Sequence, residues 1–206
     1  MKKRYKLLCL LVMLSVVLTG CRGYTDASVK IPTGWTGYTI GPLQFQFEAG
    51  WSTSDTDTLT EGLSGGAGIF SETATAKVIG ALESPVREQG TKDYLVVTCY
   101  TMEEKTQTSD LEEVMDDLNG MARTIKNQAG LNADVEQNAR IRHYGSTDAL
   151  TIAYKLSGEE VSAMIQLALI AKGDHVFQIA YCDFTTIKDD STLEAILSSL
   201  TISLED

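Results

Sequence analysis

Gly62-Leu63-Ser64-Gly65-Gly66 is the segment of this chain that comes nearest to a catalytic motif. It matches the G-x-S-x-G turn that exposes the nucleophilic serine of many hydrolases, a turn that needs a buried apolar strand before it and a helix after it. Residues 56 to 61 are polar and loop-like instead. His143 or His175 could complete a serine–aspartate–histidine order, but any chain with two histidines could do so. A flexible glycine loop is therefore the favoured interpretation, and a serine hydrolase is the weakest functional alternative.

The acidic residues offer two candidate cation sites, and neither is complete. Asp55-Thr56-Asp57 begins like a calcium-binding loop, but Leu59 and Thr60 stand where a ligand and a glycine belong. The second candidate would line one side of a helix, where a solvated face is the favoured interpretation: Glu112, Glu113, Asp116 and Asp117. Neither histidine has a second histidine or cysteine at ligand spacing, so zinc is not expected. The sequence also lacks P-loop and dinucleotide-binding motifs, and we expect no metal and no cofactor.

Two cysteines, Cys99 and Cys182, fall late in apolar runs that are typical of strands. By the alternation of a strand, Cys99 shares a face with Leu95 and Val97, which favours a buried free thiol. A disulfide between the two is the alternative, because an oxidising compartment would allow one.

The first 21 residues have the architecture of an export signal. A positive start is followed by Leu7 to Leu18, a run of twelve residues that is apolar except for Ser15. As a helix this run spans about 18 Å, less than the roughly 30 Å hydrocarbon core, so a permanent membrane-spanning helix is the weaker interpretation. The exit, Leu18-Thr19-Gly20-Cys21, resembles the lipobox of bacterial lipoproteins. That resemblance implies cleavage before Cys21 and lipid on its sulfur, whereas an ordinary cleavable signal with a chance cysteine is the alternative.

The net charge argues against a nucleic-acid partner. Removing the four positive charges of Lys2, Lys3, Arg4 and Lys6 from the net charge of −11 leaves −15 on the rest of the chain. So acidic a surface is repelled by nucleic acid and by anionic lipid. We expect contact with the membrane through lipid on Cys21, because two or more acyl chains hold a protein stably where one does not. The expected location is the extracytoplasmic face of the cell membrane.

We divide the chain into a signal peptide (residues 1–20), a lipidated cysteine with a tether (21–38) and one α+β domain (39–206). Glycine, proline, serine and threonine are frequent in the tether, which reaches at most about 60 Å when extended. Within the domain, residues 52 to 68 are polar and glycine-rich, a long connection of the kind that is often functional or disordered.

Alternating strands are expected through the domain. Residues 39 to 47 alternate, with Phe45 and Phe47 on the buried face. Further strands are expected at 77–82 and 94–101, in a strand ending near Arg142, and in a meander from 150 to 181. The strand at 161–170 is apolar on both faces, which predicts that it is central and covered on both sides.

Two amphipathic helices complete the expected elements. The first begins at a capping box of Ser109 and Glu112 and has an apolar stripe of Leu111, Val114, Met115, Leu118, Met121, Ala122 and Ile125. Gly130 is expected to end it. The second begins at Ser191 and Glu194 and buries Leu193, Ile196, Leu197 and Leu200. This order predicts an antiparallel sheet with helices packed on its faces.

The segment Phe45-Gln46-Phe47-Glu48-Ala49-Gly50-Trp51 resembles the aromatic strand and Gly-Trp turn of PsbP-like domains. The run from Gly173 to Tyr181, followed by Leu193 to Leu200, is similar to the last strand and helix of that family. The resemblance spans residues 39 to 203 in element order and implies a PsbP-like (Mog/PsbP/DcrB-type) sandwich. It departs where Ala49 replaces the usual proline. The family's members are mostly accessory or assembly proteins without a shared catalytic site, so the resemblance implies no site residue.

The sequence favours a non-enzymatic envelope lipoprotein whose domain binds a protein partner or assists an envelope assembly. A small-ligand or cation carrier that uses the glycine-rich loop and its acidic residues is the second alternative, and a serine hydrolase the third.

Overall fold

The computed structural model describes residues 23–56, 74–86, 91–129, 132–158, 162–184 and 191–204. The expected signal peptide, Cys21, the Gly62–Gly66 motif and Gly130 lie outside these ranges. None of the helices in the described part is long and apolar enough to cross a membrane.

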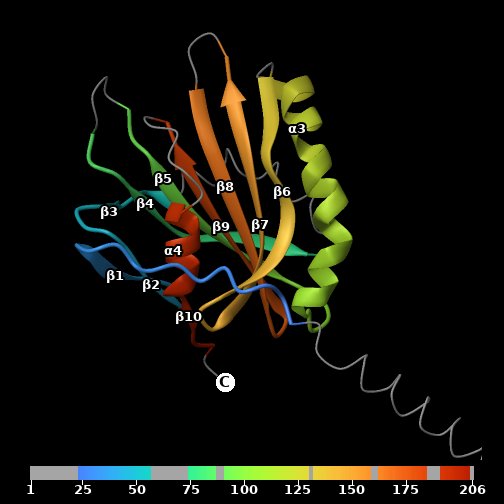
Figure 1. The fold of residues 1–206 in the computed structure, drawn as a ribbon, viewed down its shortest axis with the longest axis horizontal. Coiled ribbons are helices and arrows are strands. Elements are labelled where there is room, and N and C mark those ends of the chain that lie inside the picture. Colours follow the sequence, from blue (N-terminus) through green and yellow to red (C-terminus); the bar gives the residue numbers. More distant parts are fainter. Residues whose placement is uncertain are drawn as a thin grey trace, which may run out of the picture.

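A seven-stranded antiparallel sheet forms the centre of the molecule (Figure 1). Its strands lie in the order β3-β4-β5-β9-β8-β7-β6. Along the chain they are β3 (Ser52–Thr53), β4 (Thr75–Glu83), β5 (Tyr94–Thr101), β6 (Asn132–Tyr144), β7 (Thr147–Ser157), β8 (Ser162–Lys172) and β9 (His175–Asp183). β8 lies inside the sheet and its side chains are buried on both faces, which confirms the pattern expected at 161–170.

A smaller sheet contains the hairpin of β1 (Trp35–Ile40) and β2 (Leu43–Glu48), together with β10 (Thr201–Ile202). The expectation of one strand across residues 39 to 47 is wrong at the turn. Gly41 takes a positive φ of 53° just before Pro42, and the chain reverses there. The expected alternation is confirmed within β2, where Phe45 and Phe47 are buried between exposed glutamines.

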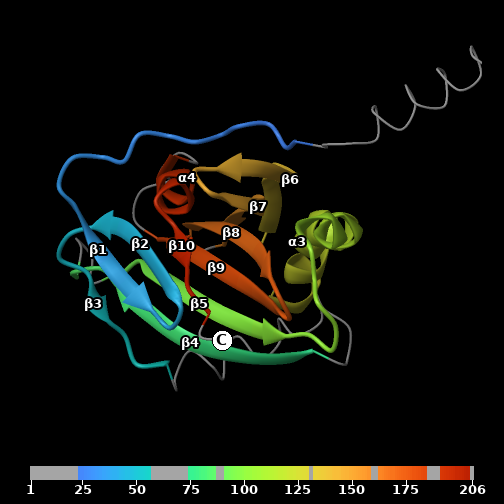
Figure 2. The ribbon, with the colours of Figure 1, turned by 90° about the horizontal axis from the view of Figure 1, so that it is seen from below.

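Helices and the smaller sheet cover the two faces of the large sheet (Figure 2). α4 (Ser191–Ser198), β1, β2 and β10 lie on one face, and α3 (Met115–Ala129) lies on the other. A short 3-10 helix, η3 (Thr108–Val114), leads into α3. Each face buries its own apolar cluster. The described chain is therefore an α+β domain, as the sequence predicts.

Phe47 is the centre of the cluster under the small sheet. Its side chain is fully buried, and its ring centroid lies 4.5 Å from that of Trp51, 5.5 Å from that of Trp35 and 5.9 Å from that of Tyr181. The rings of Trp35, Trp51 and Tyr181 thus all pack on Phe47. Because Tyr181 belongs to β9, these contacts fix the β1–β2 hairpin on the large sheet.

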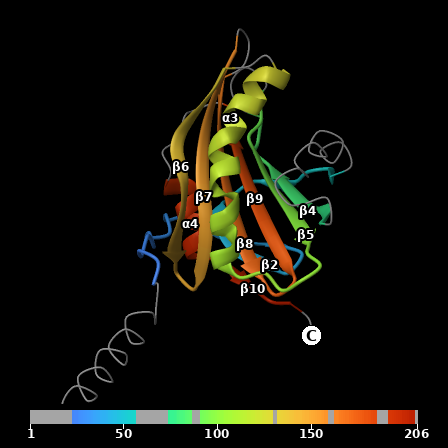
Figure 3. The same cartoon turned by 90° about the vertical axis from the view of Figure 1, so that its right-hand side faces the viewer.

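The first helix begins earlier than expected and with a different cap. The chain enters η3 at Gln107, whose backbone N–H donates to the Asp110 carboxylate at 2.7 Å. The capping box assigned to Ser109 and Glu112 is wrong, because both residues already lie inside η3. The apolar stripe holds over the described side chains, with Leu111, Leu118 and Ala122 buried against the sheet. Figure 3 shows α3 running along this face, where it packs on β6 and β7.

Side-chain contacts on both sides of α3 fix it to the strands beneath. The Tyr154 hydroxyl of β7 donates to the Leu118 carbonyl at 2.6 Å. The Asn119 side-chain oxygen accepts from the Ala139 N–H at 2.9 Å, where the pairing register of β6 is interrupted. The helix is thus held by the Tyr154 hydroxyl of β7 and by the Ala139 N–H of β6, which lies where the strand pairing is interrupted.

α4 agrees with the sequence in both position and buried face. It begins at Ser191, and Leu193, Ile196 and Leu197 are buried, as is Leu200 just beyond it. Arg140 of β6 forms an ion pair with Glu194 at 3.6 Å across this interface.

Candidate functional site

Residues 25–29, which we call the N-terminal strap, lie against the domain. The Ala27 N–H donates to the His143 carbonyl at 2.8 Å, and the His143 N–H donates to the Thr25 carbonyl at 3.0 Å. Asp26 thereby forms a parallel bridge with His143 at the end of β6. The expected tether of residues 21–38 is therefore docked over part of its length, and its expected boundary falls inside β1.

Hydrogen bonds of two serine hydroxyls, Ser28 in the strap and Ser198 in α4, fasten the strap to the domain. The Ser28 hydroxyl donates to the Asp26 carboxylate at 2.6 Å and accepts from the Gly145 N–H at 2.8 Å. The Val29 N–H donates to the Ser198 hydroxyl of α4 at 3.0 Å. Ala27 packs on the apolar cluster beneath. The strap therefore contacts β6, the turn after it and α4.

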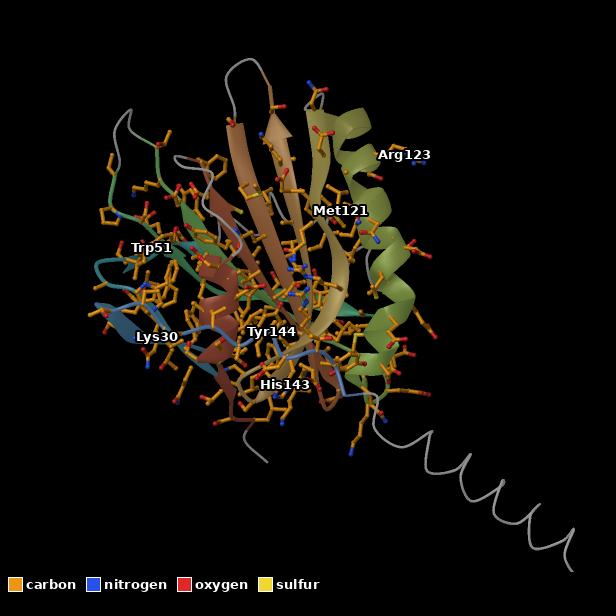
Figure 4. All side chains as sticks on the ribbon, viewed as in Figure 1. Lys30, Trp51, Met121, Arg123, His143 and Tyr144 are labelled. Atoms are coloured by element: carbon orange, nitrogen blue, oxygen red, sulfur yellow. The ribbon has the colours of Figure 1, made fainter. Side chains whose placement is uncertain are left out.

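His143 lies at the centre of this contact, and Figure 4 shows it beside the strap at the end of β6. Its Nδ1 lies 2.7 Å from the Asp148 carboxylate. The hydrogen bond with Asp148 raises the pKa of His143, and the charges of Asp148 and Asp26 raise it further. Hydrogen bonds from the Ser28 side chain and backbone lower the pKa of Asp26, with a smaller contribution from His143. The strap is thus joined to the sheet by hydrogen bonds, and the attraction between Asp26 and His143 is a smaller contribution.

Gly145 permits the close approach of this turn to α4. Its φ is +59°, and a Cβ built there would lie 2.5 Å from the Ser198 carbonyl oxygen. A larger residue would have to displace helix backbone. The turn residue is thus required for the place that the strap occupies.

Two shallow hollows, each about 470 Å³, lie at the same end of the domain and share Thr108, Asp148, Ala171 and Lys172. We call this the strap end. It contains the turn after β6, the turn between β8 and β9, and the start of η3, and Tyr24 lines one hollow just before the strap. The described chain also ends here, after β10 (Figure 1).

The hollows are suited to hydrogen bonding. Hydroxyl groups of Thr108, Ser109, Ser146, Thr147 and Thr201 line them, with one lysine, Lys172, and two carboxylates, Asp148 and Glu112. Such a surface can bind polar groups through hydrogen bonds, and its few charges of both signs do not select strongly for an anion or a cation.

The residues that the sequence proposes for catalysis or metal binding are not brought together where the structure describes them. Asp55 is exposed, and Asp57 lies outside the described residues together with the Ser64 motif. The acidic side of the first helix is solvated, with Glu112, Glu113, Asp116 and Asp117 all exposed. Across the described residues, no three histidine, cysteine or acidic side chains are placed to hold a metal ion. His175 lies 3.5 Å from Asp174, and His143 is bound at the strap.

Cys99 and Cys182 are free thiols, as favoured from the sequence, but both are half-buried, so the expected burial of Cys99 is only partial. In the pairing of β5 with β9, Cys99 stands opposite Phe177 and Cys182 opposite Tyr94. Five residue steps separate them, about 17 Å, and a disulfide needs Cα atoms within about 7 Å. Burial raises the pKa of the Cys182 thiol to about 12, with a further contribution from Asp93.

The strap is the feature that the sequence analysis misses. The hydrogen bonds between the strap and the rest of the domain join residues more than a hundred positions apart, and most involve backbone groups that every residue carries. The alternation of Thr25, Ala27 and Val29 with polar residues is the one signal in the sequence, and it is too short to distinguish a docked segment from a tether.

No protein-family model and no curated protein matches the chain. Solved structures similar to it include LpqN of Mycobacterium tuberculosis, described as involved in cell envelope biogenesis. It is 12% identical, with 89% of this chain and 100% of LpqN covered and a TM-score of 0.48. A protein of Bacteroides thetaiotaomicron is 9% identical, with 81% of this chain covered and a TM-score of 0.47; the chain spans about half of its length, 48%. A Pseudomonas aeruginosa protein of unknown function is 10% identical, with 73% of this chain and 83% of that protein covered and a TM-score of 0.37. These similarities assign no family.

Proposed function

We propose that this chain is an exported lipoprotein, anchored through lipid on Cys21, whose domain is a non-enzymatic binding module on the extracytoplasmic face of a membrane. The observation that carries the proposal is the placement of the strap directly after the signal. Cys21 precedes Thr25, whose carbonyl accepts from the His143 N–H, by four residue steps, about 14 Å when fully extended. A cleavage site at Cys21 would thus leave an intact folded domain with its lipid beside it.

Replacement of Cys21 tests the anchor, and the signal supplies a matched control. Cys21→Ala removes the sulfur that would be lipidated, and we expect the protein to leave the membrane fraction or to remain an uncleaved precursor. Cys9→Ala changes the other cysteine of the same segment, within the apolar run, and should leave fractionation unchanged. A Cys21→Ala protein that is correctly cleaved and still sediments with membranes would show that lipid on this residue is not the anchor.

The partner is proposed to be a protein that contacts the connection expected from Ser52 to Gly68. Its first two residues form β3 instead of a loop, and most of the rest lies outside the described residues. Support comes from its length, its glycine content and its carboxylates, which include Asp55 and Glu61. Shortening residues 54 to 66 should leave the melting temperature near that of the parent, because loop-closure entropy changes slowly with length. It should also abolish in-cell crosslinking to the partner. Unchanged crosslinks in a normally folded variant would refute this role for the loop.

A small polar ligand is the second candidate, and the hydroxyl-lined hollows of the strap end favour it. Ligand-dependent melting of the purified protein would support a carrier, and Lys172→Ala should then reduce the shift. We also propose a PsbP-like topology for the domain, supported by the contact of the Phe47 and Trp51 rings and by the closing helix that follows β9.

A further inference from the structure

The strap fixes where the chain that leads back to Cys21 leaves the domain. Tyr24 contacts the strap end, where it lines a hollow with Gln107, Lys172 and Gly173. The bonded residues that follow lead away from this end toward α4. The chain therefore emerges from the domain beside the turn between β8 and β9, and a lipid on Cys21 must be inserted close to that turn.

We propose that the strap end faces the lipid bilayer and that the docked strap holds the domain in this orientation. The proposal rests on the anchor at Cys21 proposed above. From Cys21 to Thr25 the chain spans at most about 14 Å, whereas β8 runs for ten steps, about 34 Å, from Ser162 to Lys172. With so short a connection, the end of β8 at Lys172 stays near the bilayer and the end at Ser162 points away from it.

Charge does not produce this orientation. Among the described residues that line the hollows, Asp148 and Glu112 outnumber the one lysine, Lys172, so the hollows form no cationic patch that would attract anionic lipid. The orientation therefore comes from the covalent anchor and the hydrogen bonds of the strap. It should persist at 1 M salt, where the Debye length falls to about 3 Å.

A fluorescence measurement on the lipidated full-length protein tests the proposal. Lys172→Cys and Ser162→Cys place a donor dye at the two exposed ends of one strand, and the parent without an added cysteine gives the background from native thiols. Each protein is reconstituted into phosphatidylethanolamine–phosphatidylglycerol vesicles that carry an acceptor dye on the headgroup. We expect clearly greater energy transfer from position 172 than from position 162, in low and high salt alike.

Release of the strap supplies the second arm. The double substitution Ala27→Pro/Val29→Pro removes the N–H donors to His143 and Ser198. The nearest fixed element is then β1, and the free chain from Cys21 to Trp35 reaches about 50 Å. The difference in energy transfer between dyes at positions 172 and 162 should therefore become smaller. Lys30→Pro, just beyond the bonded residues, is the matched control and should keep the parent difference.

The outcomes separate the anchor from the orientation. A parent protein that does not bind the vesicles overturns the anchor, and the orientation with it. If the Lys172→Cys and Ser162→Cys proteins with an intact strap bind the vesicles but give equal transfer, the orientation alone is overturned. A double variant that binds and retains the full difference would show that the strap does not hold the domain.

Discussion

Leu118→Ala is expected to lower the free energy of unfolding by about 3–5 kcal/mol, in the upper part of the range for a buried leucine. Leu118 is 1% exposed and lies mid-stripe on α3, so the substitution removes apolar contacts on the core side of the helix. The size of the loss depends on whether the helix can settle into the space left behind. Here the Tyr154 hydroxyl holds the Leu118 carbonyl and Asn119 holds the Ala139 N–H, which prevents that movement.

Urea unfolding of the unlipidated protein, followed by circular dichroism, measures this loss as a lower midpoint at constant slope. Glu113→Ala is the control, because Glu113 is exposed in η3, and its effect should stay within about 0.5 kcal/mol. Tyr154→Phe removes one of the two hydrogen bonds that hold the helix, so the double variant with Leu118→Ala should lose less than the sum of the two single losses. Equal losses of unfolding free energy from Leu118→Ala and Glu113→Ala would refute the assignment of Leu118 to the buried side of the helix and Glu113 to the exposed side. Strict additivity with Tyr154→Phe would refute the argument from restricted movement.

Three further predictions concern the strap and the core. Gly145→Ala should lower the free energy of unfolding by at least about 2 kcal/mol in the same assay, because the φ of Gly145 is +59° and the new Cβ would meet the Ser198 carbonyl. Gly120→Ala is the control: Gly120 lies in open space on α3, and the substitution should be neutral or stabilising by up to about 1 kcal/mol. A larger loss at Gly120 than at Gly145 would contradict the turn geometry. Hydrogen exchange at the Ala27 amide should be slowest between about pH 4 and 6.5 after correction for intrinsic rates. Asp148 is the main cause of the raised pKa of His143, and Asp26 of the strap adds to it. The Asp26 part is present below the ordinary value of 6.5 and is lost as pH rises through the raised pKa, whereas the contribution of Asp26 itself, whose pKa is lowered, is lost only as pH falls below 3.8. Protection that does not change from pH 6 to 9 would refute the His143–Asp26 attraction. Cys182 should react with a thiol reagent at pH 8 more slowly than Cys99, because desolvation raises its pKa to about 12, and mass spectrometry that finds equal labelling of these two half-buried cysteines would contradict that shift.

Hydrophobic periodicity predicted the elements whose burial is decided by their own residues. β8 is apolar on both faces and is central, and α4 begins at Ser191 with the expected buried side chains. The alternation of Phe45 and Phe47 placed both rings in the core. In these segments, local pattern and tertiary packing agree, so the pattern was sufficient.

The errors arose where a backbone detail or a distant partner decides the structure. The turn at Gly41-Pro42 interrupts a pattern that alternates on both sides of it, so period alone did not reveal the turn. At the first helix, Gln107 and Asp110 close the first turn, although the serine and glutamate just after them match the usual capping sequence better. The strap depends on Gly145 and Ser198, which are 117 and 169 residues away from their strap partners, and no local signal reports such contacts.

The mass of the N-terminal peptide, taken from the protein in the membrane fraction, decides whether Cys21 carries the lipid anchor. We predict a peptide that begins at Cys21 and carries acyl chains on that residue. A peptide that begins at Met1, or one that begins at Cys21 without added lipid mass, would contradict the anchor on which the proposed function and orientation depend.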